Sequence, residues 1–436
     1  MQELSIHSNQ KEMTIEKHSK FRICLIGQNI HIQSRNSDTG LLWPLAKGLS
    51  QKGHEVVIIS SSSPLKKYEL TRDNVKAFYL QDGSSPFKNL KLVDAIHRKF
   101  TQLHNENPFD LVHSVDQSGF KIGKHKKNFQ ILMAYDVQAI HLSDLFATLA
   151  EDDGSLFSQI STYFKLIWKF INNYLATDRS LLSTADGIFV TTPQQRLILE
   201  RYFLYPDFHT YTVPYGINLG NLTTRLESET FKLKNNFPEN SKLILATTDF
   251  VNAMEVSPLL KAFEKIISKH DHIYLILVGD GPKWKEVEFM MLSRVLGSKV
   301  IMPKDLIAEE LLDYIAASSV YVDLSSRSTG LEPSLIEAMA QKKIVIGSEL
   351  SPIAEIIEDH IDGFLVRPAD DRTIFHLLDQ ILENESAYLK MGEAAREKVI
   401  NFFNKDKMLL ALIRAYEQII HKSASFKRRK MLKKAD

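Results

Sequence analysis

Short apolar runs alternate with amphipathic segments along the chain from residue 21 onward. The runs have the length of buried strands, and the longer segments repeat apolar residues at helical spacing. Because strands alternate with helices, the first half predicts a parallel, doubly wound sheet. Its strands are expected at 21–27, 55–60, 110–113, 130–134 and 185–191, and its helices at 41–50 and 194–202.

The alternation stops at the Pro- and Gly-containing stretch 211–218 and begins again at Lys242. The chain is therefore expected to hold two doubly wound α/β units in tandem, after a polar, loosely ordered lead at 1–20. A long helical stretch is expected at 373–421. The other elements expected in the second half are strands at 242–247, 273–279, 299–302, 320–324 and 343–347, and helices at 256–269, 283–296, 309–318 and 334–341.

Composition and charge narrow the possible functions. The 436 residues are 44% hydrophobic and 25% charged, which is typical of a folded globular chain and excludes disorder as the main state. Lys and Arg total 54 against 53 Asp and Glu, so the net charge of +1 gives no general attraction to nucleic acid. The single cysteine, Cys24, excludes an intramolecular disulfide and a Cys-based zinc site, and its apolar neighbours predict a buried thiol.

Three segments of the chain indicate where in the cell the protein is expected. No apolar stretch approaches 18 residues and residues 1–20 lack the apolar core of a secretion signal, so a cytoplasmic protein is expected. The tail 421–436 holds seven Lys and Arg, which indicates either a solvated, frayed end or a peripheral contact with the anionic inner face of a membrane, at about 1 kcal/mol per basic residue. The amphipathic stretch 157–175 predicts a helix that packs between domains, or, as the less favoured alternative, one that docks on a membrane.

Several common enzyme motifs are absent from the sequence. The first strand ends in Gly27-Gln-Asn-Ile-His, without the G-x-G-x-x-G of a dinucleotide site. His54-Glu55 is followed by valines, which excludes a zinc-binding H-E-x-x-H helix there. Neither a Walker A loop nor a G-x-S-x-G elbow occurs, so the NAD, NTPase, metalloprotease and hydrolase classes lose support.

A more specific pattern lies in the second half. It reads Gly330-Leu-Glu-Pro-Ser-Leu-Ile-Glu-Ala-Met-Ala340 and continues through Ile344-Val-Ile-Gly347 and Asp362-Gly-Phe-Leu-Val366. Leu277-Val-Gly-Asp-Gly-Pro282 precedes it, and Lys52-Gly-His-Glu-Val56 stands near the N-terminus. In two tandem doubly wound units, ligands are expected at the carboxyl ends of the strands. Over about residues 20–420 the chain resembles the GT-B glycosyltransferases of family 4, the glycosyl transferases group 1.

The resemblance implies two Rossmann-like domains that face a cleft, with a C-terminal helix that returns toward the N-terminal domain. It implies an acceptor-side domain at 21–215, a donor-binding domain at 216–400, and a return helix with a basic tail at 401–436. It also implies a retaining hexosyltransferase of the kind used in polysaccharide biosynthesis. Such an enzyme takes a nucleotide sugar as its substrate and a glycan, glycolipid or protein as its acceptor. The resemblance implies no cofactor, and no metal is required.

The resemblance further implies site residues. Glu337, in the first turn of the helix 334–341, matches the glutamate that accepts hydrogen bonds from the nucleotide's ribose. Asp136 follows the strand 130–134 and would line the reaction centre. Backbone amides near the start of a helix suit sugar hydroxyls or phosphate. The residues expected to bind the donor are Gly40, Asp249, Gly279, Arg327, Thr329, Gly330, Leu331, Glu332 and Glu337.

The sequence departs from the family pattern at four positions. Thr329 stands where the family usually carries a Glu, eight positions before the second one. Asp249 and Met254 stand where the family has an Arg and a Lys against the donor diphosphate, and Asp136 stands where it has a His. No Arg or Lys occurs between 243 and 260.

These departures leave two functions open. A cation 4 Å from the growing phosphate charge is worth about 4 kcal/mol at an effective dielectric of 20, or on the order of 10³ in rate. Lys283, Lys304, Arg327 or a divalent metal at Asp249 could replace the missing cations. The chain is therefore either an active glycosyltransferase or a catalytically impaired relative that acts as a binding or scaffold subunit.

Overall fold

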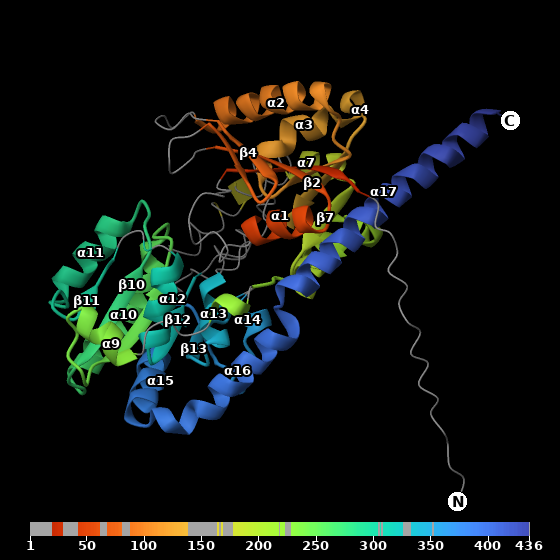
Figure 1. Cartoon of the computed structure of the whole chain (residues 1–436). Helices are drawn as coiled ribbons and strands as arrows, with labels where there is room; N and C mark the ends of the chain where they lie inside the picture. Colours follow the sequence, from red (N-terminus) through yellow and green to blue (C-terminus); the bar gives the residue numbers. More distant parts are fainter. Residues whose placement is uncertain are drawn as a thin grey trace, which may run out of the picture.

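The protein forms two parallel sheets, each covered by helices on both faces (Figure 1). This arrangement confirms the expected pair of doubly wound units. The computed structural model describes residues 20–28, 42–61, 68–80, 88–137, 164, 167–168, 178–217, 219–222, 228–303, 306, 308–325, 333–350 and 353–435, and the structural statements below concern these residues.

The N-terminal sheet has the strand order β3-β4-β2-β1-β5-β6-β7-β8, and every pairing is parallel except β3 with β4. The chain turns to opposite sides of β1 when it forms β2 and β5, so the topological switch point lies between β1 and β5. The strands are β1 (Arg22–Gly27), β2 (Glu55–Ser60), β3 (Glu69–Arg72), β4 (Val75–Tyr79), β5 (Leu111–Ser114), β6 (Leu132–Asp136), β7 (Gly187–Val190) and β8 (Thr210–Thr212).

Helices bury both faces of this sheet, which explains why its strands are continuous apolar runs. In β1, Ile23, Cys24, Leu25 and Ile26 are all fully buried, and burial raises the pKa of the Cys24 thiol, as expected for a core cysteine. The helices of this half are α1 (Leu42–Gln51), α2 (Lys88–Glu106), α3 (Phe120–Lys124), α4 (Lys126–Phe129), α7 (Arg179–Thr184) and α8 (Pro193–Phe203).

The C-terminal sheet is entirely parallel, with the order β11-β10-β9-β12-β13-β14 and its switch point between β9 and β12. One core cluster packs α10, α11 and α15 on one face, and a second packs α12, α13 and α16 on the other. The strands are β9 (Lys242–Thr247), β10 (Ile273–Val278), β11 (Val300–Ile301), β12 (Val320–Asp323), β13 (Ile344–Ser348) and β14 (Phe364–Val366). The helices are α9 (Ser228–Lys234), α10 (Ala253–Ile267), α11 (Trp284–Ser293), α12 (Ala308–Ala317), α13 (Pro333–Ala340), α14 (Ile353–Ile356), α15 (Asp371–Glu383) and α16 (Leu389–Phe402).

The chain passes between the two halves twice, and the two crossings lie against each other. The amide of Ile217 donates to the carbonyl of Phe403 (2.9 Å), and that of Lys405 donates to the carbonyl of Ile217 (3.2 Å). Gly216 allows this approach, because a Cβ there would lie 2.7 Å from the Cα of Lys405. Beyond the second crossing, α17 (Lys405–Ala435) packs its buried residues, among them Met408 and Tyr416, into the N-terminal core. This is the expected return helix.

The helical stretch expected at 373–421 is divided into three α-helices, because non-helical backbone at Asn384 (φ −144°, ψ 71°) ends α15 and a break after Phe402 separates α16 from α17. A hairpin of β3 and β4 was not expected. Its turn residues Asp73 and Asn74 both have positive φ (48° and 62°), the requirement of a two-residue hairpin turn.

The basic tail is not frayed, since α17 remains helical to Ala435. Of the stretch 157–175, only Phe164, Ile167 and Trp168 are described, and all three are exposed, so these side chains do not make the packing contacts that the favoured interpretation predicted. The remainder of 157–175 and residues 1–19 lie outside the described residues. No helix within the described parts of the chain combines the length and the apolar character needed to span a membrane. The membrane contact of the tail and the domain boundaries stay predictions.

Candidate active site

The loop after β9 contains Asp249 and is held by the turn that follows β10. The amide of Thr248 donates to the carbonyl of Val278 (3.0 Å), and Asp249 Oδ1 accepts from the amide of Val251 (3.0 Å). Gly279 has φ +144°, and a Cβ at this position would lie 1.8 Å from the carbonyl oxygen of Thr248. Only glycine permits this contact. The Gly-Asp-Gly-Pro motif therefore allows the close backbone packing of the Asp249 loop. The Asp249 side chain caps a local turn.

Hydrogen bonds join the first turn of α13 to β9 and β12, the two central strands of the sheet. Thr247 Oγ1 lies 2.6 Å from the Tyr321 hydroxyl and 3.2 Å from Ser334 Oγ, and the Tyr321 hydroxyl donates to Ser334 Oγ (2.8 Å). All three hydroxyls are buried. Because they satisfy one another, the start of α13 stands at the carboxyl edge of β9 and β12. This is where a parallel sheet presents a ligand site.

Glu337 lies on the same helix and is 5% exposed. The expectation that it belongs to the first turn is wrong, because α13 begins at Pro333 and Glu337 is its fifth residue. Proline is favoured at the first position of a helix, where its missing N–H costs nothing, and it moves the start one residue earlier. A buried carboxylate needs hydrogen-bond donors nearby, as the resemblance implies for Glu337.

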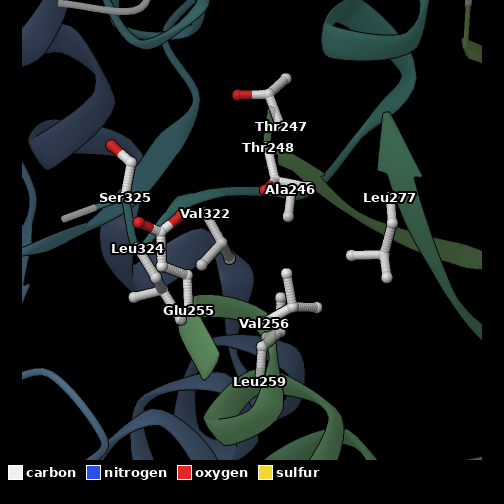
Figure 2. A pocket seen from close by; sticks show the side chains of 10 residues that line it. All are labelled: Ala246, Thr247, Thr248, Glu255, Val256, Leu259, Leu277, Val322, Leu324 and Ser325. Atoms are coloured by element: carbon white, nitrogen blue, oxygen red, sulfur yellow. The ribbon is translucent and has the colours of Figure 1, made fainter. Parts of the chain in front are cut away.

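A small cavity marks the switch point between β9 and β12. It measures about 20 Å³ and lies between the strand ends and the first turns of α10 (Figure 2). Thr248 and Ser325 contribute polar atoms from the loops, and the Glu255 carboxylate comes from the first turn of α10, where a negative charge is favoured. Its remaining walls are Ala246, Thr247, Val256, Leu259, Leu277, Val322 and Leu324.

On the N-terminal sheet, Asp136 belongs to a chain of three hydrogen-bonded side chains. His113 at the end of β5 places Nε2 3.0 Å from Asp136 Oδ1, at the end of the neighbouring strand β6. Its Nδ1 lies 2.8 Å from the hydroxyl of Tyr416 on α17. Burial, and secondarily the Asp136 charge, raises the pKa of Tyr416, so its hydroxyl stays protonated. A carboxylate oxygen can only accept, so Nε2–H donates to Asp136, and if the imidazole is neutral its Nδ1 accepts from the Tyr416 hydroxyl.

A cavity of about 40 Å³ opens beside Asp136. Its walls come from four parts of the chain: the strand ends of the N-terminal sheet, α1, the first crossing and α17. The strand ends contribute His113 and Thr191, α1 contributes Leu45, the crossing contributes Val213–Tyr215, and α17 contributes Met408 and Leu412. Asp136 therefore faces the place where the N-terminal sheet meets the segments that lead to the other half.

The structure describes four of the predicted site residues. Glu337, Asp249 and Gly279 lie at the carboxyl edge of the C-terminal sheet, and Asp136 lies at that of the N-terminal sheet. Lys283 pairs with Glu286 (2.6 Å) in this structure, so its charge is already compensated. The other predicted residues, Gly40, Arg327, Thr329, Gly330, Leu331 and Glu332, lie outside the described residues, as do Lys304 and the loop before α13.

Sequence reasoning missed His113 and Tyr416. His113 stands at the end of the strand expected at 110–113. The carboxyl ends of adjacent parallel strands meet, so the pairing of 110–113 with 130–134 would have pointed to its contact with Asp136. Nothing in the local sequence of Tyr416 indicates that it enters this site. The described residues hold a single group of potential metal ligands, and it lies away from both sheet edges described here.

The comparisons with known proteins agree with this geometry. Residues 227–398, which contain α10, the Gly279 turn and α13, match the family model of the glycosyl transferases group 1. Residues 227–398 belong to this family. The resemblance drawn from the sequence is thereby confirmed for this segment.

Two curated relatives show the extent of the likeness. The chain is 30% identical over 235 residues to an N-acetyl-alpha-D-glucosaminyl L-malate synthase of Bacillus anthracis, covering 53% of this chain and 59% of that protein. It is 22% identical over 381 residues to an uncharacterized glycosyltransferase of Methanocaldococcus jannaschii, covering 86% of this chain and 92% of the relative. The glycosyltransferase likeness thus extends beyond the family segment.

Solved structures support the whole fold. A sucrose-phosphate synthase from Thermosynechococcus elongatus superposes with a TM-score of 0.74 at 20% identity, over 92% of this chain and all of that chain. A HepE protein of Anabaena in complex with UDP-glucose superposes with a TM-score of 0.68 at 13% identity, over 93% of this chain and all of that chain. At these identities the likeness establishes the GT-B fold alone.

Proposed function

We propose that the protein transfers a sugar, with retention, from a nucleotide-sugar donor to a glycan, glycolipid or protein acceptor. The observation that carries the proposal is Glu337, a buried residue of α13, the helix that starts at the ligand edge of the C-terminal sheet, within the segment that matches the family. A ribose hydroxyl that donates to this carboxylate adds a charge-assisted hydrogen bond to the interactions that Glu337 already makes in the protein. The amides at the start of α13 suit the sugar or its phosphates.

Asp136 provides the second part of the proposal. It lines a cavity beside the crossing segment, and its partner His113 is buried and oriented by Tyr416. An imidazole that the family places after strand β6 is here supplied from β5. We infer that Asp136 faces the reacting sugar, and that His113 holds this side chain in place. Transfer requires neither a cofactor nor a metal in this proposal.

The first experiment is a calorimetric titration of the full chain with UDP, GDP and ADP and their common sugar conjugates. UDP-glucose and UDP-N-acetylglucosamine come first, because a similar structure contains the former and a similar protein is named for the sugar of the latter. One conjugate is expected to bind. Glu337→Gln should raise its dissociation constant by about tenfold to 100-fold, since a charge-assisted hydrogen bond contributes about 1.5–3 kcal/mol. Glu393→Gln, an exposed change on α16, is the matched control.

Release of free nucleotide then reports turnover, with and without acceptors. Asp136→Asn should bind the donor normally and release nucleotide at least 100-fold more slowly. Donor binding without turnover in the wild-type protein would favour the binding-subunit alternative. Absence of binding across the whole panel by a folded sample would refute the donor site.

A further inference from the structure

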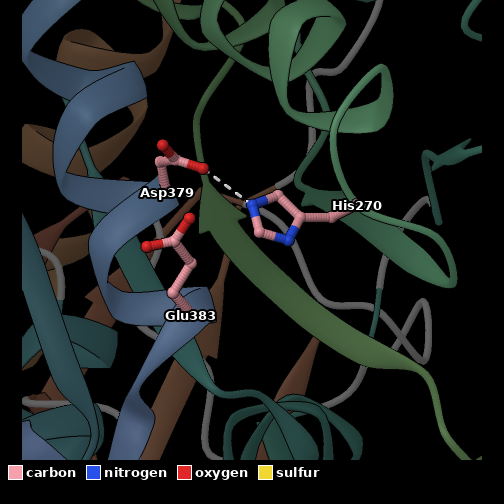
Figure 3. A group of neighbouring side chains, drawn as sticks. All are labelled: His270, Asp379 and Glu383. Carbon is pink, nitrogen blue, oxygen red and sulfur yellow. Dashed lines mark hydrogen bonds and ion pairs between the residues drawn. The ribbon is translucent and has the colours of Figure 1, made fainter.

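Three metal-ligating side chains meet at the edge of the C-terminal sheet opposite to Glu337. His270 stands between α10 and β10, where the strand begins, and Asp379 and Glu383 lie on α15 (Figure 3). One nitrogen or oxygen of each residue lies within 4.8 Å of those of the other two. The donor set is therefore one imidazole nitrogen and two carboxylate oxygens.

Two of the three ligands are held in place by the fold. The His270 amide donates to the carbonyl of Ile266 (2.9 Å), and Nε2 lies 2.7 Å from Asp379 Oδ1. The side chain of Asp379 is 12% exposed, and that of His270 is 20% exposed. Core residues of α10 and α15, such as Ile266 and Leu378, pack the two helices together. The third ligand, Glu383, is four residues from Asp379 on the same helix face and is 60% exposed, so it can adjust.

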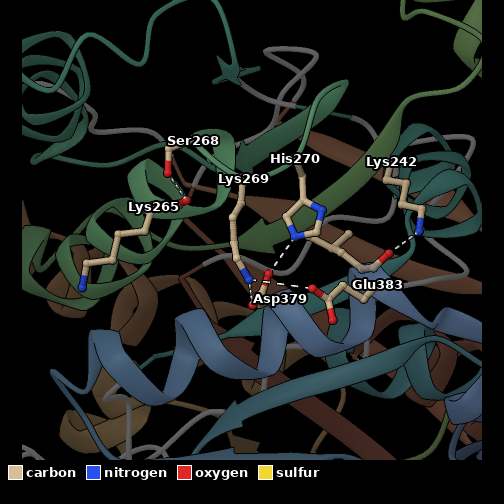
Figure 4. A network of polar contacts seen from close by, with 8 residues as sticks. Lys242, Lys265, Ser268, Lys269, His270, Asp379 and Glu383 are labelled. Atoms are coloured by element: carbon tan, nitrogen blue, oxygen red, sulfur yellow. Dashed lines mark hydrogen bonds and ion pairs between the residues drawn. The ribbon is translucent and has the colours of Figure 1, made fainter.

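A cation already occupies this position. Lys269 Nζ lies 2.6 Å from Asp379 Oδ2 and 3.7 Å from Glu383 Oε1 (Figure 4). The neighbouring lysines have other partners: Lys265 pairs with Asp371 (2.8 Å), and Lys242 donates to the carbonyl of Leu382 (2.6 Å). Lys269 is half exposed on a flexible stem, so its ammonium can leave without disturbing the core. The two carboxylates thus attract positive charge to a site that a stronger cation can take over.

We propose that His270, Asp379 and Glu383 bind a divalent transition-metal ion, with Zn²⁺ preferred, which displaces the Lys269 ammonium from the two carboxylates. An imidazole with two carboxylates suits Zn²⁺ and its neighbours, whereas Ca²⁺ and Mg²⁺ prefer oxygen ligands alone. At zinc–ligand distances of 2.0–2.2 Å, tetrahedral ligands lie about 3.4 Å apart. To bring ligand atoms that lie up to 4.8 Å apart to this spacing, one of them must move by roughly 1.5 Å, and the exposed Glu383 side chain can make this movement.

The ion would join the end of α10 to the end of α15. It leaves the donor edge untouched, so its role is structural and independent of the proposed transfer reaction. A ligand that binds only the folded chain raises the melting temperature, because it stabilises that state by RT ln(1 + L/Kd), where L is the free ligand concentration. Metal binding and donor binding can therefore be tested separately on the same protein.

The test is a calorimetric titration of the chelator-treated full chain with ZnCl₂, followed by MnCl₂ and CaCl₂, with melting curves in parallel. One equivalent of Zn²⁺ should bind and raise the melting temperature, and Ca²⁺ should bind at least tenfold more weakly. His270→Ala and Glu383→Gln should each lower the Zn²⁺ association constant at least tenfold. His376→Ala removes an exposed imidazole from α15 outside the group and should leave it unchanged.

The Lys269→Met variant distinguishes a metal site from an ordinary salt-bridge cluster. If Zn²⁺ and the ammonium compete for the same oxygens, this variant should bind Zn²⁺ about tenfold more tightly while its metal-free form melts at a lower temperature. Absence of saturable Zn²⁺ binding in both the wild-type protein and Lys269→Met would overturn the proposal. Binding that survives His270→Ala unchanged would also overturn it.

Discussion

Tyr416 and His113 are 303 positions apart in the chain, and a buried hydrogen bond of 2.8 Å joins the hydroxyl of the first to Nδ1 of the second. The contact places a residue of the last helix within two hydrogen bonds of Asp136. The return helix therefore does more than cover the N-terminal core, because it orients the imidazole that contacts Asp136.

Replacement of Tyr416 by Phe should lower the free energy of unfolding by about 1–3 kcal/mol, since it leaves a buried imidazole nitrogen without its donor while the ring packing remains. Urea denaturation measures this change. Tyr388→Phe, at a partly buried tyrosine whose ring packs on Phe364, is the control and should change stability by less than about 0.5 kcal/mol. Equal effects of the two variants would contradict the role given to the Tyr416 hydroxyl.

His113→Gln tests whether His113 positions Asp136. If the proposed function is correct, nucleotide release should fall by roughly tenfold to 100-fold, whereas the dissociation constant of the donor should change less than about twofold. The reason is that His113 contacts Asp136 and Tyr416, while Glu337 lies on helix α13 beside the other sheet. Turnover assays and calorimetry on the same variant separate these effects. A loss of donor affinity with unchanged turnover would contradict the role of His113 in positioning Asp136.

Gly279→Ala should destabilise the protein by about 3 kcal/mol or more, because the new Cβ would overlap a backbone carbonyl and the residue has φ +144°. Gly297→Ala is the matched control. Its nearest neighbour is the flexible end of Leu292 at 3.3 Å, so a change within about 1 kcal/mol is expected. Denaturation of both variants by urea provides the comparison, and a mild effect at Gly279 would show that the turn can relax.

Lys343 predicts a pH dependence of stability. Burial lowers the pKa of its ammonium from 10.5 to about 8, with Glu385 acting in the opposite direction. Between these values the folded chain has lost a proton that the unfolded chain still binds, so the free energy of unfolding should rise with pH. Relative to Lys343→Met, the wild-type protein should gain up to about 3 kcal/mol between pH 7 and pH 10.

Urea denaturation at the two pH values measures this gain. Lys342→Met removes an adjacent, exposed ammonium and should show the same pH dependence as the wild-type protein. Parallel curves for the wild-type protein and Lys343→Met would contradict the burial of a strained charge at Lys343.

The donor side could be predicted from the sequence because its pattern is local. The Gly279–Pro282 turn and the segment around Glu337 are contiguous motifs, and each acts through backbone within a few residues of itself. The start of α13 was misplaced by one residue because Pro333 was assigned to the preceding loop. Helix ends are set by capping and by neighbouring hydroxyls such as Ser334, which a hydrophobic pattern does not reveal.

The sequence by itself determined the two doubly wound sheets and the buried Cys24, because burial on both faces of a parallel sheet leaves continuous apolar runs that are visible locally in the chain. It also determined the glycosyltransferase segment, because that motif is contiguous. Only the tertiary structure decided which distant side chains meet. The contact of Tyr416 with His113 and that of His270 with Asp379 depend on helix packing and on strand order. These arise from the summed burial of two whole domains, and no local stretch of sequence carries that information.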